Sequence, residues 1–428
     1  MKKIPLHIQI LISLSLGLIF SIISIKLGIF ASFTIKYIKP FGIIFLNSLK
    51  MIAIPLIIAS LVLGITNVQD INKLSRIGGK TIFIYFITAI IAIIIGLIIV
   101  NILKPGNIIP KKTRNELMLL YSDKTEKNRF FSKKIQQEGP MQILVNIVPD
   151  NLFKALTNNL NLLQIVFLSI IFGVALLKIP IKNRKQIILL LEGINDVNLE
   201  IIKFIMKFAP IGVFSLISSL LIEITGKDNP DQIFEILYAL LWYSFTVIFG
   251  LSIMNFLIYP LILKLFTEVK YFDFINGIKP AQLVAFATSS SSATLPITME
   301  SVEKNLKVPE EISSFVLPLG ATINMNGTCL YQSIAIVFIA QALDLNLSIT
   351  AQVMIVINVA VSSIGVAGVP GVSIVTTAMI LELIGIPVAG LALILAPDRI
   401  LDMCRSATNI TGDAVAAILV SNSEKNKI

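Results

Sequence analysis

The stretch AFATSSSSATLP, residues 285–296, interrupts an otherwise apolar part of the chain with four consecutive serines and a proline. A second stretch, SSIGVAGVPGVS at 362–373, interrupts its own apolar surroundings with glycines. A helix needs about 20 apolar residues to cross the hydrocarbon core of a membrane, and each interruption comes before that length is reached. Each stretch therefore predicts a helical hairpin that enters the membrane and turns back inside it.

Each interrupted stretch precedes an apolar helix with a polar centre. These helices contain PLGATINMNGTCLYQ (318–332) and DRILDMCRSATNITGD (398–413). Irregular backbone persists at membrane depth only where protein, water, ions or substrate satisfy its N–H and C=O groups. Paired interruptions at matching positions predict a transporter binding site at the bilayer midplane. The alternative is a pair of lipid-exposed kinks packed by small residues, as in any membrane helix bundle.

The composition indicates an all-α integral membrane protein. The 428 residues are 55% hydrophobic and 14% charged, and the mean hydropathy is +0.88. Soluble domains carry about 25% charged residues. Six apolar runs before the interrupted region are long enough to span the membrane: 8–30, 42–68, 80–103, 160–179, 198–223 and 233–266.

The basic residues predict orientation rather than a nucleic-acid partner. The net charge is +10, but Lys and Arg are spread through loops between the spans, with no aromatic-interleaved basic module. Their excess on alternate loops places both termini in the cytoplasm, with membrane lipid around the spans. Loop 104–140 conflicts with this rule, because it holds nine Lys or Arg on the expected outer side. We expect it to be a solvated insertion.

The helix expected at 398–413 carries ionisable side chains in apolar surroundings. At about 100° per residue, its polar residues fall within an arc of about 80°. They are Asp398, Asp402, Arg405, Asn409 and Asp413. Ionisable residues inside a membrane mark substrate or ion pathways by default. The alternative is a self-neutralising network that holds Arg405 between Asp398 and Asp402. It leaves Asp413 without a partner on this helix.

The chemistry of this face favours an acidic amino acid. Arg405 is a fixed cation whose planar fork matches a carboxylate bidentately. Asp402, one turn away on the same face, is placed to receive an ammonium group. Ser291 and Thr328 offer further hydrogen bonds. A cavity with these groups fits a zwitterion that carries an additional carboxylate.

The remaining polar groups of the face favour a small cation. Asn409 and Asp413 lie beside the carbonyl groups of a helix expected to unwind near 320–326, and such oxygen ligands suit sodium. A negatively charged substrate that enters a negative cell interior needs coupling cations, because each net charge costs about 2.3 kcal/mol per 100 mV. We expect sodium ions as coupling ions and no other cofactor.

These segments resemble the dicarboxylate/amino acid:cation symporter family, the glutamate and aspartate transporters, from the first span to the last helix. The motifs that carry the resemblance are LKMIAIPLIIASLVLGI (49–65), NLFKALTNNLNLLQIVF (151–167), FAPIGVFSLI (208–217), the hairpin serines, NMNGT (324–328), GVAGVPG (365–371) and D-x-x-R-S/T-x-x-N-x-x-x-D (402–413). The resemblance implies eight transmembrane helices plus two re-entrant hairpins in the cell (inner) membrane. It also implies a homotrimer with an elevator-type mechanism.

The resemblance further implies a scaffold and a mobile transport domain in each protomer. The scaffold would comprise residues 1–79 (helices 1–2) and 104–230 (helices 4–5 with the outer loop). The transport domain would comprise residues 80–103 (helix 3), 231–271 (helix 6) and 272–428 (both hairpins with helices 7 and 8). The two hairpins would act as gates.

Individual site residues follow from the same resemblance. The substrate would contact Ser290, Ser291, Thr328, Val369, Gly371, Asp402, Arg405, Ser406 and Asn409. Arg405 would bind the side-chain carboxylate and Asp402 the amino group. One sodium site resembles Gly320, Asn324, Asn409 and Asp413. A second resembles backbone oxygens near Thr322, Ser363, Ile364 and Val366.

A third sodium site of the family would comprise Tyr85, Thr88 and Asn326, and it is weakened here. Asn326 replaces the aspartate of NMDGT, and Ala89 stands where a hydroxyl is usual. We therefore expect fewer than three coupled sodium ions, or a proton in place of one.

Further departures concern coupling, kinetics and substrate choice. Gln332 replaces the proton-carrying glutamate of potassium-coupled relatives, so we expect no potassium counter-transport. Neither Ser289 nor Met403 is the arginine found at one of these positions in relatives, so binding kinetics cannot be carried over. Dicarboxylate-selective relatives have serine at the position of Asp402, so an amino acid is favoured over a C4-dicarboxylate.

Other functions stay open or are disfavoured. The alternatives are a proton-coupled glutamate symporter, a C4-dicarboxylate symporter, and an anion channel that uses the same cavity. An intramembrane protease would need a Ser–His dyad, HExxH or GxGD, and the sequence has none; its single histidine, His7, lies at the mouth of the first span. We therefore expect a transporter and not an enzyme. The sequence does not distinguish glutamate from aspartate, which differ by one methylene.

Overall fold

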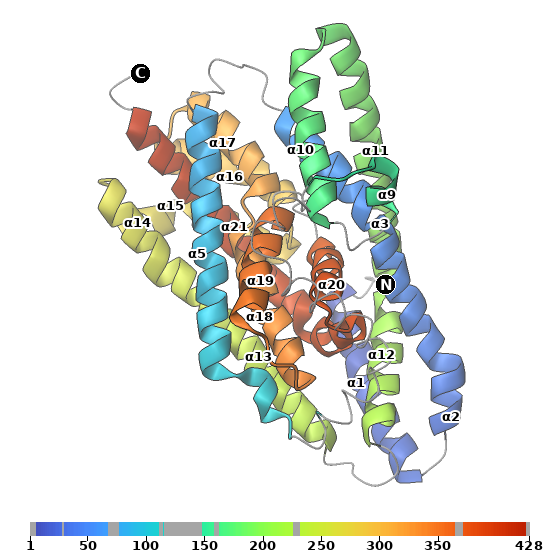
Figure 1. Ribbon diagram of the computed structural model, residues 1–428. Coiled ribbons are helices and arrows are strands. Elements are labelled where there is room, and N and C mark those ends of the chain that lie inside the picture. The colour runs from blue at the N-terminus through green and yellow to red at the C-terminus, as the bar shows by residue number, and fades with distance from the viewer. Residues whose placement is uncertain are drawn as a thin grey trace, which may run out of the picture.

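The computed structural model describes residues 6–27, 30–66, 77–110, 114, 148–157, 162–225, 232–363 and 371–424. In this part of the chain every regular element is a helix, as the sequence predicts. The helices form an elongated bundle (Figure 1). Many of them are apolar on several sides, as membrane helices are.

One group of helices packs around α3 (Lys39–Thr66). α3 contacts α10 (Leu162–Lys178), α11 (Ile181–Lys207) and α12 (Ala209–Thr225). α12 also packs along α1 (Leu6–Leu27), which is followed by the short α2 (Ala31–Phe33) and the π-helical turn η1 (Thr34–Ile38). The five-residue α9 (Leu152–Leu156) contacts α10. In Figure 1, α2, α3, α10 and α11 lie on the right of the view.

The span expected at 198–223 is not a single helix. Residues 198–223 are divided, because α11 ends at Lys207 and α12 begins at Ala209. The two helices meet at an angle of 54°. Pro210 lies in the first turn of α12, where its missing N–H would be unpaired in any case. α11 also begins earlier than expected, at Ile181, so it includes a stretch that the sequence analysis assigned to no span.

A second group of helices packs around α21 (Leu391–Glu424), the longest helix described. α21 contacts members of this group along its length. They are α5 (Gly79–Leu103), α13 (Gln232–Ile253), α14 (Tyr259–Phe266), α15 (Tyr271–Thr288), α16 (Ser291–Glu300), α17 (Glu310–Ile323), α18 (Asn326–Ala342) and α20 (Val372–Ile384). α19 (Ile349–Ser363) reaches the group through α5, α18 and α20.

Short helical turns lie within the second group or pack against it. They are η3 (Pro105–Ile108), η5 (Met254–Ile258), η6 (Ser301–Asn305) and η7 (Val388–Gly390). η5 joins α13 to α14 without an interruption in the helical chain, so 232–266 forms one long helix, as expected for 233–266.

Both interrupted stretches form pairs of packed helices. α15 ends at Thr288, and the next residue, Ser289, has a left-handed backbone (φ 54°). Ser290 caps α16 by accepting a hydrogen bond from the Ala293 N–H. α15 packs against α16, and α19 packs against α20. Gly371 (φ 87°) precedes α20. The chain from 364 to 370, between α19 and α20, lies outside the described residues.

The helix between the two pairs is broken at its polar centre. α17 and α18 are separated by Asn324 and Met325, whose backbones leave the helical region. The apolar window within Glu310–Ala342 is entirely buried by the rest of the protein. Protein, not lipid, therefore surrounds the irregular backbone, which is the condition for such a break at membrane depth.

The outer surface requires a membrane. Within the described residues, Gly79–Ile108, Phe234–Phe266 and Glu310–Ala342 are long and apolar enough to span one, and the bent pair α11–α12 is a fourth candidate. α5 exposes large apolar side chains at helical spacing: Ile82, Phe86, Ile94, Ile98 and Ile102. A stripe of this size is not stable in water, whereas lipid accommodates it. The protein is a multi-pass membrane protein.

We predict that Gly96→Ala destabilises the contact between α5 and α18. A Cβ atom at Gly96 would overlap Ser333 Oγ and lie 2.8 Å from the Leu330 carbonyl oxygen, so the helices must separate. Overpacking of this kind costs about 1–3 kcal/mol, and the midpoint of thermal unfolding of the purified protein should fall. Gly193→Ala is the control, because nothing lies within 4 Å of its Cβ position. Equal midpoints for the two variants would contradict the close packing.

Candidate functional site

The first half of α21 holds a buried cluster of charges. Arg405 is completely buried and donates hydrogen bonds to Asp398 Oδ1 (3.0 Å) and Asp402 Oδ1 (2.7 Å). Both aspartates are buried as well. A buried guanidinium needs such partners, because an unpaired charge away from water is very costly. The structure thus shows Arg405 between Asp398 and Asp402, the arrangement that the sequence analysis considered as its alternative.

An aromatic ring supports the guanidinium from the neighbouring helix. The Arg405 Cζ atom lies 3.7 Å from the centroid of the Tyr331 ring, which α18 contributes. Cation–π contacts of this kind stabilise a desolvated arginine. Arg405 is therefore fixed by two carboxylates on α21 and one ring on α18. The sequence analysis did not single out Tyr331, because the sequence does not reveal which face of α18 meets α21.

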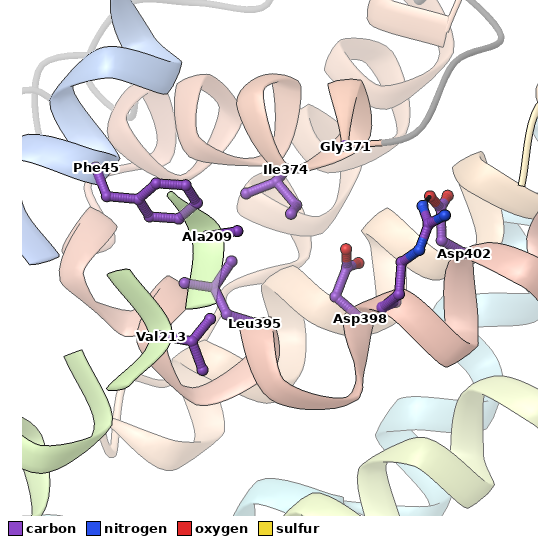
Figure 2. A pocket seen from close by; sticks show the side chains of 9 residues that line it. Phe45, Ala209, Val213, Gly371, Ile374, Leu395, Asp398 and Asp402 are labelled. Atoms are coloured by element: carbon purple, nitrogen blue, oxygen red, sulfur yellow. Dashed lines mark ion pairs between the residues drawn. The ribbon is translucent and has the colours of Figure 1, made fainter. Parts of the chain in front are cut away.

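A small cavity of about 20 Å³ adjoins the charge cluster (Figure 2). Asp398 and Asp402 line it from α21, and Gly371 lines it from the start of α20. Phe45 of α3 and Val213 of α12 close its other side. The cavity therefore lies between the two groups of helices. A space of this size is large enough for one water molecule.

Two unpaired hydroxyl groups lie at the tip of the first helix pair. The side-chain oxygens of Ser289 and Ser291 are buried and have no hydrogen-bond partner among the described residues. Leaving a buried hydroxyl unpaired costs about 1–3 kcal/mol. α16, which begins at this tip, packs against α21, and Ser406 of α21 is also buried. The tip therefore offers donors and acceptors to a polar ligand.

Asn409 connects α21 to the start of α18. Its Oδ1 atom accepts hydrogen bonds from the backbone N–H of Gly327 (2.8 Å) and of Thr328 (3.4 Å). Its Nδ2 atom donates to Thr328 Oγ1 (3.3 Å). The structure therefore brings together two of the predicted substrate residues, Thr328 and Asn409. The same contacts satisfy the N–H groups that the break before α18 leaves unpaired.

Asp413 meets the broken helix at the expected cation site. Asn324 Nδ2 donates to Asp413 Oδ1 (2.7 Å), so Asp413 has its partner on another helix. A Cβ atom at Gly320 would lie 2.5 Å from Asp413 Oδ1 and 2.6 Å from the Tyr85 hydroxyl, so only glycine fits there. Asn324 Oδ1 is buried and has no hydrogen-bond partner within the described chain. A carboxylate and an unpaired amide oxygen together suit a hard cation.

The residues expected at the third sodium site make separate contacts. The Tyr85 hydroxyl donates to the Val316 carbonyl (2.8 Å) and lies close to Gly320. The Thr88 hydroxyl donates within its own helix, to the carbonyls of Ile84 and Tyr85. Asn326 Nδ2 donates to the Tyr259 hydroxyl (3.2 Å), while Asn326 Oδ1 has no partner in the part of the chain described.

The second expected sodium site is described only in part. Ile364 and Val366 lie outside the described residues, as does Val369 of the expected substrate site. The hydroxyls of Thr322 and Ser363 each donate to a carbonyl of their own helix, which leaves their backbone carbonyls as the candidate ligands.

Gln332 forms a polar link between α18 and α20. It is fully buried, and its Nε2 atom donates to Thr376 Oγ1 (2.6 Å). An amide carries no charge at any ordinary pH. Gln332 is therefore a neutral cross-link between α18 and α20.

We predict that Tyr331→Leu destabilises the protein and that Tyr331→Phe does so much less. Leucine removes the ring beneath a fully buried guanidinium, whereas phenylalanine keeps it. The lost cation–π contact amounts to about 2 kcal/mol when the cation is desolvated. Thermal unfolding of the two purified variants measures the difference. Equal loss in both would assign the stabilisation to the hydroxyl group and contradict the prediction.

Comparison with known proteins gives one consistent result. The model of the sodium:dicarboxylate symporter family matches residues 6–423. A proton/sodium-glutamate symport protein of Geobacillus stearothermophilus is 37% identical, over all of this chain and 98% of the relative. A proton/glutamate-aspartate symporter of Escherichia coli is 32% identical, over 91% of this chain and 86% of the relative. Human excitatory amino acid transporter 3 is 32% identical, over 90% and 79% respectively. The chain belongs to the sodium:dicarboxylate symporter family.

Proposed function

We propose that the chain is a secondary active symporter that imports an acidic amino acid, L-glutamate or L-aspartate, together with sodium ions. The observation that carries the proposal is the completely buried Arg405, held between Asp398 and Asp402 beside a broken helix. Relatives named for glutamate and aspartate symport, which match 100% and 91% of this chain, support the substrate class.

Substrate binding is an exchange of charge partners. The side-chain carboxylate of the substrate takes the place of an aspartate on Arg405, so the buried guanidinium is never unpaired. Asp402, once released, receives the substrate ammonium. The second carboxylate of the substrate is left for the hydroxyls of Ser289 and Ser291, which have no partner among the described residues, and for Ser290 at the start of α16. Arg405 thus exchanges one carboxylate for another, and Asp402 exchanges a guanidinium for an ammonium group.

Sodium binds where the broken helix meets Asp413 of α21. Asp413, Asn324 and Gly320 gather there, with Asn409 one turn before Asp413 on α21. We assign the first sodium ion to this group and a second to backbone oxygens near Thr322 and Ser363. The scattered contacts of Thr88 and Asn326 support fewer than three sodium ions, or a proton in place of one.

The two groups of helices correspond to a scaffold and a transport domain. We propose that α1, α3 and α10 to α12 stay in place and that α5 and α13 to α21 move through the membrane as one body. The contacts within each group support this division, and the cavity in Figure 2 lies between them. The proposal includes a homotrimer in the cell membrane with both termini in the cytoplasm.

A proton-driven symporter is the second candidate. The relatives in Geobacillus stearothermophilus and Escherichia coli are named for proton coupling, with or without sodium. The weakened third cation site is the feature of this chain that favours it. A C4-dicarboxylate is less favoured as substrate, because Asp402 would repel a carboxylate that carries no ammonium.

Uptake into proteoliposomes tests the proposal. Labelled L-glutamate and L-aspartate are supplied with a sodium gradient and a proton gradient imposed separately. Accumulation driven by sodium supports the symporter proposed here. Accumulation driven by protons alone would support the proposed substrate and contradict sodium as the coupling ion. Equilibration without accumulation, under either gradient, points to a channel.

We predict that Arg405→Cys abolishes the preference for acidic amino acids. The variant cannot form the two charge-assisted hydrogen bonds proposed between Arg405 and the substrate side-chain carboxylate. The affinity for L-aspartate should therefore fall on the order of 100-fold or more. Small neutral amino acids should become the better competitors, because no buried cation is then left unpaired. Competition uptake with L-serine and L-aspartate measures this shift. A variant that still selects the acidic amino acid would contradict the role of Arg405.

We predict that Asp413→Asn weakens sodium coupling more than substrate recognition. With the negative ligand gone, the sodium concentration for half-maximal uptake should rise on the order of tenfold. Glu300→Gln is the control, because Glu300 is exposed and pairs with Lys304 in the next turn. An unchanged sodium dependence in Asp413→Asn would place the cation elsewhere.

A further inference from the structure

A second arginine lies beside the charge cluster. Arg399 follows Asp398 on α21, and its Nη1 atom is 3.6 Å from Asp402 Oδ2. Its side chain is 18% exposed, whereas that of Arg405 is not exposed at all. Arg399 also lines the cavity shared with Asp398, Asp402 and Gly371, where Figure 2 shows the two aspartates on one stretch of α21.

The four charges of this stretch balance. Asp398, Arg399, Asp402 and Arg405 alternate in charge along two turns of α21, so these four side chains together carry no net charge. Asp402 lies between both cations: Oδ1 accepts from Arg405 at 2.7 Å, and Oδ2 faces Arg399 at 3.6 Å. When Arg405 turns to a substrate carboxylate, Arg399 is the cation that remains next to Asp402.

The contact of Arg399 differs in kind from that of Arg405. A separation of 3.6 Å exceeds the range of a hydrogen bond, so charge alone attracts Arg399 to Asp402. Arg399 Nε is buried and has no hydrogen-bond partner in the described part of the protein. Arg399 is therefore not fixed by a network of its own, and its charge acts on Asp402 without holding it in one hydrogen-bond geometry.

We infer that Arg399 is a positioning residue that competes with the substrate ammonium for Asp402. It compensates the carboxylate before the substrate arrives and repels the ammonium once it has bound. Arg399 thereby limits the affinity for the amino acid and speeds its release. The inference rests on the proposed function, since it requires that Asp402 receives an ammonium group.

Neutralising Arg399 should strengthen amino-acid binding, whereas a variant that damages the fold would weaken it. The cluster with bound substrate then gains one negative charge, so an ammonium should be held more tightly and leave more slowly. An acid without the ammonium should bind more weakly in the same variant. Since Arg399 is partly exposed, solvent screens the effect, and we expect a change in Kd of about threefold to tenfold.

The experiment uses the full-length purified protein at saturating sodium. Kd for L-aspartate is measured by calorimetry for the wild type, Arg399→Gln, Arg399→Met and Arg399→Lys, with succinate as the competitor that lacks an ammonium. KM and kcat for uptake are measured in proteoliposomes. Lys203→Gln is the control of equal charge change, because Lys203 is an exposed residue of α11 paired with Glu200.

The inference predicts tighter L-aspartate binding, lower KM, lower kcat and weaker competition by succinate in both neutral variants. Arg399→Lys should resemble the wild type, as should Lys203→Gln. Arg399→Met retains most of the apolar stem, so it keeps the test valid if Arg399→Gln folds poorly. Unchanged or weaker L-aspartate binding in the neutral variants overturns the inference. A wild-type protein that binds neither acid refutes the proposed function instead.

Discussion

A guanidinium with no exposure to solvent is the constraint on which the rest of this structure depends. Arg405 can be buried inside the membrane only because carboxylates of its own helix and an aromatic ring of α18 contact it. Those contacts require α18 to lie against α21. The surrounding helices then exclude lipid from every polar group of the cluster.

The same constraint suggests how binding is coupled to motion. In the proposed mechanism, a substrate carboxylate takes the place of an aspartate that stabilises Arg405. At the break between α17 and α18, Asn324 donates a hydrogen bond to Asp413 of α21, and an ion bound there would stabilise the same contact between helices. If sodium and substrate both favour one arrangement of α17, α18 and α21, each must raise the affinity of the other by the same factor.

The sequence allowed much of this arrangement to be predicted, within limits that have physical causes. The serine and glycine interruptions, and the arc of polar residues on one helix, depend only on local pattern, and the structure contains the corresponding helices. The break between α11 and α12 was missed because both sides of it are apolar. Tyr331 was missed because its role depends on which face of α18 meets α21. Arg399 lies about 100° around the helix from Asp398, outside the arc, and only the reach of its side chain brings it to Asp402.

The position of the substrate tests the account most directly. A cryo-electron microscopy structure of the full-length protein with sodium and L-aspartate would show which groups contact the amino acid. The account predicts a substrate carboxylate on Arg405, with the substrate ammonium on Asp402. An Arg405 still held by Asp398 and Asp402, with the amino acid bound elsewhere, would contradict it.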